Sequence, residues 1–144
     1  DAGYAKKARQ WANRLHAPTA IADKRRIDHT ESAEVVELIG EVAGRTALIV
    51  DDFTITAGTL TDAARVLVER GATDVYAAVS HALLTGPANE RLDASPIRQL
   101  LTTDSVETQP AGLSAKVEVV SVGGLFAEAI RRIAARESVS VLFR

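Results

Sequence analysis

Two adjacent carboxylates, Asp51 and Asp52, stand between an apolar run at residues 47–50 and a turn of small and hydroxyl residues at 56–59. Two ionised carboxylates at neighbouring positions repel each other unless a cation or hydroxyl groups share their charge. We therefore expect them to bind sugar hydroxyls, either directly or through Mg²⁺, which prefers oxygen ligands and needs few protein carboxylates. A strand-end aspartate that only caps a neighbouring turn is the structural alternative.

The turn itself, Thr56, Ala57, Gly58 and Thr59, is a candidate phosphate site. Apolar residues recur at helical spacing from Leu60 onward, so a helix is expected to begin directly after the turn. A helix N-terminus offers unpaired backbone N–H groups and a partial positive charge, and the small residues let backbone approach a ligand. The hydroxyls of the two threonines can add hydrogen bonds. Alternatively, Thr59 only caps the helix and Gly58 serves a tight turn.

A basic triplet, Lys24-Arg25-Arg26, lies in a strongly polar stretch at residues 23–32, which we expect to be an exposed, mobile loop. Alone, such a triplet predicts a solvated surface. Beside a phosphate site it can clamp a polyphosphate and stabilise charge that develops in a transition state. The three histidines show no metal-ligand spacing, and His81, which follows a predicted strand, is expected to be structural.

Strands and helices alternate along the chain, which predicts an α/β fold with a mostly parallel sheet covered by helices on both faces. Ligands of such sheets bind beyond the carboxyl ends of the strands, where the aspartates and the 56–59 turn gather. Residues 33–42 fit a helix about as well as a strand. The other expected elements are helices at 5–15, 60–70 and 125–133, strands at 19–22, 46–50, 75–80, 99–102 and 117–122, and a loop at 81–87.

Composition fits one domain spanning residues 1–144, with 47% hydrophobic residues, 25% charged residues and a net charge of -2. This balance gives no indication of nucleic-acid binding, and the absence of cysteine excludes disulfides and thiolate metal sites. No segment is apolar enough to cross a membrane and no signal peptide is visible, so a cytoplasmic location is expected by default. The chain begins at Asp1 without Met, which suggests a part of a longer protein.

A series of collinear motifs runs along essentially the whole chain: Asp1-Ala2-Gly3, the Lys24-Arg25-Arg26 loop, Ile39-Gly40-Glu41-Val42, Val50-Asp51-Asp52, Thr56-Ala57-Gly58-Thr59-Leu60, Ser80-His81, Gly86-Pro87-Ala88, Ala127-Glu128-Ala129-Ile130-Arg131-Arg132 and the tail Glu137-Ser138-Val139-Ser140-Val141-Leu142-Phe143. With these motifs the chain resembles the C-terminal half of ribose-phosphate pyrophosphokinases. That family implies a type I phosphoribosyltransferase-like fold and transfer of diphosphate from MgATP to O1 of ribose 5-phosphate, with release of AMP. It also implies a homo-oligomer in the full-length protein.

The resemblance also implies a role for individual residues. The 56–59 turn would hold the 5-phosphate, Asp51 and Asp52 the ribose, and Asp1 the ribose region and its Mg²⁺. Residues 33–42 would form a strand after the basic loop. Catalytic residues of that loop would be Lys24 and Arg26, and residues near an allosteric nucleotide and phosphate site would be Ser138, Ser140 and Phe143.

Two departures from the family pattern keep other functions open. The family's loop usually carries a third acidic residue where this chain has Ile55, whose side chain cannot accept hydrogen bonds; a buried Ile55 that packs the loop is the structural expectation. Family members are also longer, and their N-terminal half supplies most ATP contacts, so this chain alone is expected to be inactive. There are two alternatives. One is a regulatory subunit, which Ile55 favours. The other is a phosphoribosyltransferase, which the basic loop and the 137–143 tail argue against.

Overall fold

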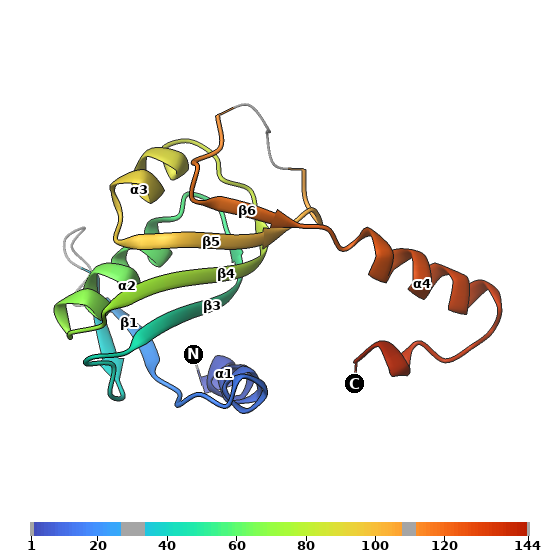
Figure 1. The fold of residues 1–144 in the computed structure, drawn as a ribbon, viewed down its shortest axis with the longest axis horizontal. Helices are drawn as coiled ribbons and strands as arrows, with labels where there is room; N and C mark the ends of the chain where they lie inside the picture. Colours follow the sequence, from blue (N-terminus) through green and yellow to red (C-terminus); the bar gives the residue numbers. More distant parts are fainter. Residues whose placement is uncertain (1, 27–33, 108–111, 144) are drawn as a thin grey trace.

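The computed structural model of the protein describes residues 2–26, 34–107 and 112–143. Figure 1 shows a twisted sheet with a helical arm that leads away from it. In chain order the elements are α1 (Ala2–Leu15), β1 (Ile21–Arg26), β2 (Glu34–Ile39), β3 (Thr46–Thr54), α2 (Gly58–Glu69), β4 (Asp74–Ala82), α3 (Ala88–Ala94), β5 (Ile97–Thr103), β6 (Val117–Val120), α4 (Gly123–Ala134) and the 3₁₀ helix η1 (Ser140–Phe143).

The central sheet has four strands in the order β3-β4-β5-β6, and all neighbouring pairs are parallel. β1 and β2 form a separate antiparallel pair. The α/β fold with a mostly parallel sheet flanked by helices is therefore confirmed, as is the parallel pairing of the strands on either side of α2. Residues 33–42, ambiguous by periodicity, contain the strand β2.

The hydrophobic core forms where α2 packs on β3 and β4, with the β1–β2 pair beside it. On β4 the buried positions alternate, so Val75, Ala77 and Val79 face the core, as the two-residue period of a strand requires. Leu60 and Leu67 supply the matching stripe of α2, spaced by two helical turns. The apolar pattern in the sequence thus fixes which face of α2 meets the sheet.

α2 ends as its sequence predicts, at a glycine. Gly71 has a φ of 88°, and its N–H donates to the Val68 carbonyl, while the N–H of Ala72 donates to Leu67. This pair of bonds is the Schellman arrangement, which satisfies carbonyl oxygens that the helix leaves unpaired. The chain then turns directly into β4, so the end of α2 and the start of the strand are set together.

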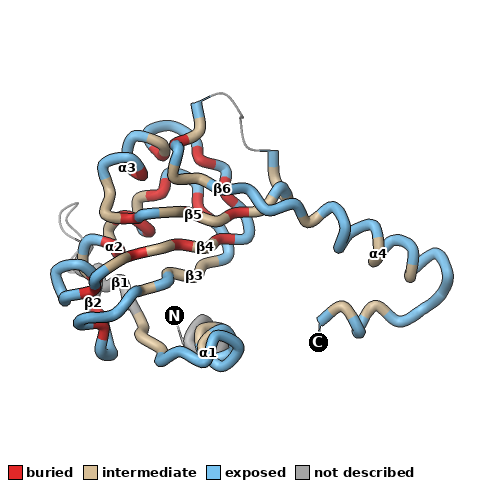
Figure 2. Tube along the Cα trace, viewed as in Figure 1, coloured by how far each residue is buried: buried red, intermediate tan, exposed pale blue. Residues whose placement is uncertain are grey.

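α4 is amphipathic, as predicted, but it does not cover the sheet. Figure 1 shows it extending away beyond the C-terminal end of β6, and none of its residues is buried (Figure 2). Its large apolar side chains, Leu125, Phe126, Ile130 and Ile133, are all more than half exposed. The expectation that helices cover both faces of the sheet is therefore not met by this helix. None of the helices within the described ranges is both long and apolar enough to cross a bilayer.

Element boundaries differ from the sequence expectations mainly at polar positions. β3 runs on through the two aspartates to Thr54, and β4 includes His81 and Ala82, which were expected in a loop. Backbone pairing between β3 and β4 continues to Thr54 and Ala82, because strand pairing does not depend on apolar side chains at an exposed edge. The short helix α3 was not predicted, since seven mostly polar residues carry little periodicity.

Candidate functional site

The turn between β3 and α2 is built on a left-handed alanine. Ala57 has φ 57° and ψ 5° and is fully buried, whereas Gly58 lies outside the left-handed region. A non-glycine residue in this conformation stores about 1–2 kcal/mol of strain. The expectation that Gly58 provides the tight turn is therefore wrong: the sharp turn is made at Ala57.

The N-terminus of α2 is left without a side-chain cap. Ala57 occupies the N-cap position and has no oxygen to offer, while its carbonyl accepts the first helical bond, from the Thr61 N–H. The expectation that Thr59 caps the helix is also wrong, because Thr59 is already the second residue of α2, two positions past the N-cap. The N–H groups of Gly58, Thr59 and Leu60 are thus the donors that a helix start leaves unpaired. Such a group of donors, with the helix dipole behind it, suits an anion.

Neighbouring segments hold this turn from two sides. The Leu83 N–H donates to the Thr54 carbonyl at 2.9 Å, and the Thr85 N–H donates to the Ile55 carbonyl at 2.9 Å. From α3, the Nη1 of Arg91 donates to the Thr56 carbonyl at 3.2 Å. Sequence reasoning missed all three contacts. The available signal was Pro87, a residue typical of helix starts, which could have revealed α3 and with it Arg91.

Asp51 and Asp52 lie on β3 itself, five and four positions before Thr56, where the 56–59 turn begins. Each carboxylate accepts a bond from the next backbone N–H: Asp51 from Asp52 at 2.9 Å, and Asp52 from Phe53 at 3.0 Å. Because adjacent side chains of a strand point to opposite faces, the two carboxylates are farther apart than neighbours in a loop would be. The repulsion expected from the sequence is correspondingly weaker.

No group of three or more carboxylate or imidazole ligands is assembled among the described residues. The donor set that remains, two carboxylates beside a phosphate-type turn, nevertheless suits Mg²⁺. This ion commonly takes one or two carboxylates and fills its remaining positions with water and substrate phosphates. One carboxylate of the pair fits that pattern, since Asp51 and Asp52 point to opposite faces of β3, and a closed protein cage is not required.

Ile55 projects from the turn rather than packing it. Its side chain is 47% exposed, so the structural expectation of a buried Ile55 is wrong. Only its backbone supports the turn, through the bond from Thr85. The position at which the family resemblance implies an acidic residue therefore faces solvent here, and its side chain is free to vary without disturbing the core.

Of the basic triplet, Lys24 and Arg26 lie on β1, where their Cα partners on β2 are Val36 and Glu34. The expectation of a loop beginning at residue 23 is therefore wrong over residues 23–26. The polar sequence misled because β1 is defined by its backbone pairing with β2, which does not depend on apolar side chains. The remainder of the predicted loop, residues 27–32, and the candidate metal ligand Asp1 lie outside the described residues.

His81 takes part in a small polar cluster at the carboxyl ends of β4 and β5. Its Nδ1 lies 2.6 Å from the Oγ of Ser105, which is also 2.7 Å from the Oγ1 of Thr103. The Thr103 hydroxyl donates to the Ser80 carbonyl at 2.6 Å. These bonds tie the two strand ends together, and the structural role of His81 stays a prediction.

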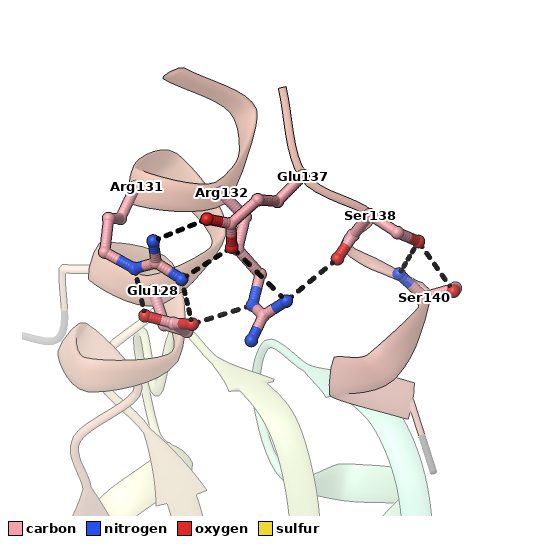
Figure 3. A network of polar contacts seen from close by, with 6 residues as sticks. All are labelled: Glu128, Arg131, Arg132, Glu137, Ser138 and Ser140. Atoms are coloured by element: carbon pink, nitrogen blue, oxygen red, sulfur yellow. Dashed lines mark hydrogen bonds and ion pairs between the residues drawn. The ribbon is translucent and has the colours of Figure 1, made fainter. Parts of the chain in front are cut away.

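The tail residues are held by α4. Figure 3 shows the contacts: Arg131 and Arg132 both bind Glu128, and both also bind Glu137. The hydrogen bond from Arg131 is the main cause that lowers the pKa of Glu128 to about 2. Arg132 also donates to the Ser138 carbonyl at 3.2 Å, so the ion pairs fold the tail back along the helix.

Beyond that point the predicted regulatory residues form their own turn. The hydroxyls of Ser138 and Ser140 are 2.8 Å apart, and the Ser140 N–H donates to Ser138. Phe143, on η1, is 76% exposed. The two serines are thus brought together with each other, but on the arm formed by α4 and not on the β3–α2 turn.

Comparison with known proteins supplies the family. The model of the phosphoribosyl synthetase-associated domain matches residues 28–144. Proteins named ribose-phosphate pyrophosphokinase from Clostridium tetani, Staphylococcus saprophyticus and Oceanobacillus iheyensis are 49%, 47% and 46% identical over 99% of this chain. The chain covers only 44–45% of their lengths.

A solved structure agrees with this result. The phosphoribosylpyrophosphate synthetase of Mycobacterium smegmatis superposes with a TM-score of 0.82 at 30% identity, over 91% of this chain and 42% of that one. The resemblance inferred from the motifs is therefore confirmed, and the chain spans less than half of the relatives that it matches. With the family model covering most of its residues, the chain belongs to the phosphoribosyl synthetase-associated domain family.

Proposed function

We propose that this chain is the ribose 5-phosphate-binding domain of an enzyme that transfers diphosphate from MgATP to O1 of ribose 5-phosphate. One observation carries the proposal: the uncapped N-terminus of α2 follows directly on β3, whose C-terminal part carries the carboxylates of Asp51 and Asp52. A sugar phosphate needs N–H donors at one end and acceptors for its hydroxyls at the other. The names of the relatives support the choice of this sugar phosphate and of ATP as the co-substrate.

In this proposal the 5-phosphate is bound by the backbone N–H groups of Gly58, Thr59 and Leu60, with the exposed hydroxyls of Thr56 and Thr59 beside them. Asp51 and Asp52 accept hydrogen bonds from the ribose hydroxyls, or bind the Mg²⁺ that accompanies the substrates. Phosphoryl transfer asks a protein mainly to position the reactants in line and to neutralise charge. The domain's contribution is to fix the ribose so that O1 is presented to the β-phosphorus of ATP.

Lys24 and Arg26 are assigned the role of neutralising the transferring phosphates, as the family resemblance implies. The rest of the full-length polypeptide is expected to supply the ATP side, and assembly into a homo-oligomer is proposed by the same resemblance. Ser138, Ser140 and Phe143 are proposed as part of a regulatory nucleotide or phosphate site. Asp1 is proposed as a further ligand of the Mg²⁺ near the ribose.

Calorimetric titration of ribose 5-phosphate into the chain, with and without Mg²⁺, tests the proposal. We expect saturable binding that Asp52→Asn weakens by about tenfold, because a charge-assisted hydrogen bond is lost. Asp62→Asn is the matched control, since Asp62 is paired with Arg65 farther along α2. A folded wild-type chain that takes up no ribose 5-phosphate would sink the proposal.

A second candidate, a regulatory subunit without turnover, is favoured by the exposed Ile55. A sec-butyl side chain at this solvent-facing position cannot bind ribose hydroxyls or hydrated Mg²⁺. The full-length polypeptide separates the two candidates. Turnover that Asp52→Asn abolishes identifies an enzyme, whereas an inactive protein that gains turnover on Ile55→Asp identifies the regulatory subunit.

A further inference from the structure

The turn that is proposed to bind phosphate lies in a negative environment. Residues 53–60 contain no cationic side chain, and Asp51 and Asp52 precede them directly. A phosphate monoester carries about -1.5 to -2 charges at pH 7, and a helix N-terminus supplies roughly +0.5. The helix dipole therefore cannot offset the charge that a bound sugar phosphate would add. A cation from elsewhere in the fold is needed.

Arg91 is placed to be that cation. Its Nη1 donates to the Thr56 carbonyl across 35 residues of sequence, and lies 3.3 Å from where a Cβ on Gly58 would be. Gly58 does not adopt a left-handed φ, so its lack of a side chain is not required by the backbone. The glycine instead leaves room for the guanidinium at the first residue of α2.

The helix that carries Arg91 is itself anchored. The Nζ of Lys116 donates to the carbonyls of Leu92, Asp93 and Ser95 at 2.9, 3.0 and 2.9 Å, at the end of α3. Ser114 adds a bond from its hydroxyl to Asp93 at 2.5 Å. These contacts fix the C-terminal end of α3, where the helix dipole favours the positive charge of Lys116. Arg91 is thus presented to the turn from a fixed support.

We propose that Arg91 is a binding residue of the phosphate turn, which it positions through Thr56 and makes selective for a dianionic phosphate. The inference rests on the proposed function and extends it to a residue on a different helix. A guanidinium that uses one N–H on a backbone carbonyl retains others for anion oxygens. One side chain can therefore both hold the turn and add positive charge to it.

The test titrates ribose 5-phosphate and, separately, inorganic phosphate into the chain at low and high salt. In Arg91→Gln we expect both affinities to fall by about tenfold or more, and their salt dependence to become shallower. Arg91→Lys should retain the salt dependence with a smaller loss, because it keeps the charge. Arg70→Gln is the control: it removes the same charge at the far end of α2, about 18 Å away.

Each outcome decides a separate question. If Arg91→Gln binds both anions as tightly as wild type, the role of Arg91 is wrong. If affinity falls with an unchanged salt dependence, Arg91 is only a structural support and the inference is again wrong. A wild type that binds inorganic phosphate through Arg91, but not ribose 5-phosphate, overturns the proposed function alone. A wild type that binds neither anion overturns both.

Discussion

The backbone N–H of Thr85 donates to the carbonyl oxygen of Ile55 at 2.9 Å, so the segment after β4 supports the turn after β3. The contact uses only backbone atoms of Ile55, and its side chain remains exposed. At Ile55, the backbone atoms that hold the turn are therefore different from the side-chain atoms that face a ligand. A substitution at position 55 can change what the turn binds without changing how it is held.

Ile55→Asp is expected to leave stability within about 0.5 kcal/mol of wild type, as surface substitutions usually do. In the presence of Mg²⁺ it should raise the affinity for ribose 5-phosphate severalfold, because a third carboxylate can accept from ribose or hydrated metal. Calorimetry and thermal unfolding measure the two effects, with Ile55→Asn as the uncharged control. An equal or weaker affinity in Ile55→Asp would show that position 55 does not contact the sugar.

Ala57→Gly is expected to be nearly neutral. Relief of left-handed strain gains about 1–2 kcal/mol, which the lost buried methyl and the freer unfolded chain offset by a similar amount. Ala64 is equally buried but lies within α2, so Ala64→Gly has no strain to relieve and should cost about 1–2 kcal/mol. Urea unfolding of the two variants measures the difference. Equal losses would contradict a strained Ala57.

These two alanines also illustrate what the sequence can predict. The position of α2, its buried stripe and its end at Gly71 follow from local periodicity and a glycine signal, and all were predicted. The tight turn was assigned to Gly58 because glycine is the usual choice. That assignment failed because the left-handed residue is the buried Ala57, and no local pattern records the tertiary contacts around it, such as the bond from Arg91 to Thr56.

The C-terminal ends of β3 and β4 were predicted too early for a related reason. Asp51 and Asp52 were expected after a strand, yet their backbone continues it, because pairing with β4 extends to Thr54. Hydropathy reports where side chains are buried, whereas strand length is decided by backbone pairing with a distant partner. The residue types of the site were therefore predictable, and their arrangement around Arg91 and Thr85 was not.

Thr102→Val should stabilise the fold. Thr61 and Thr102 are both 2% exposed, but the Thr102 hydroxyl has no hydrogen-bond partner among the described residues, while Thr61 donates to the Gly58 carbonyl at 3.0 Å. Removing the unpaired hydroxyl is expected to raise the free energy of unfolding by about 1 kcal/mol, and Thr61→Val to lower it by about as much. Chemical denaturation of both variants checks the opposite signs. A loss in Thr102→Val would reveal an unseen partner.

The ion pairs around Glu128 predict how the tail responds to acid. Its pKa is lowered from 4.5 to about 2, first by the hydrogen bond from Arg131, so the folded arm favours the charged form. A lowered pKa means that the stabilisation is complete above the ordinary value and is lost as the pH falls through about 2. NMR titration of the Glu128 carboxyl carbon should show that low midpoint, and signals of Ser138 should move with it.

Arg131→Gln should return the Glu128 midpoint toward its ordinary value, since the principal donor is removed. Arg136→Gln, just beyond α4, removes the same charge outside the contacts of Figure 3 and should leave the midpoint low. If wild type already titrates near its ordinary value, the arm is not folded back in solution. If the Glu128 midpoint is low but the Ser138 signals do not move, the tail is held by Arg132. Arg132 donates to the Ser138 carbonyl independently of the charge on Glu128.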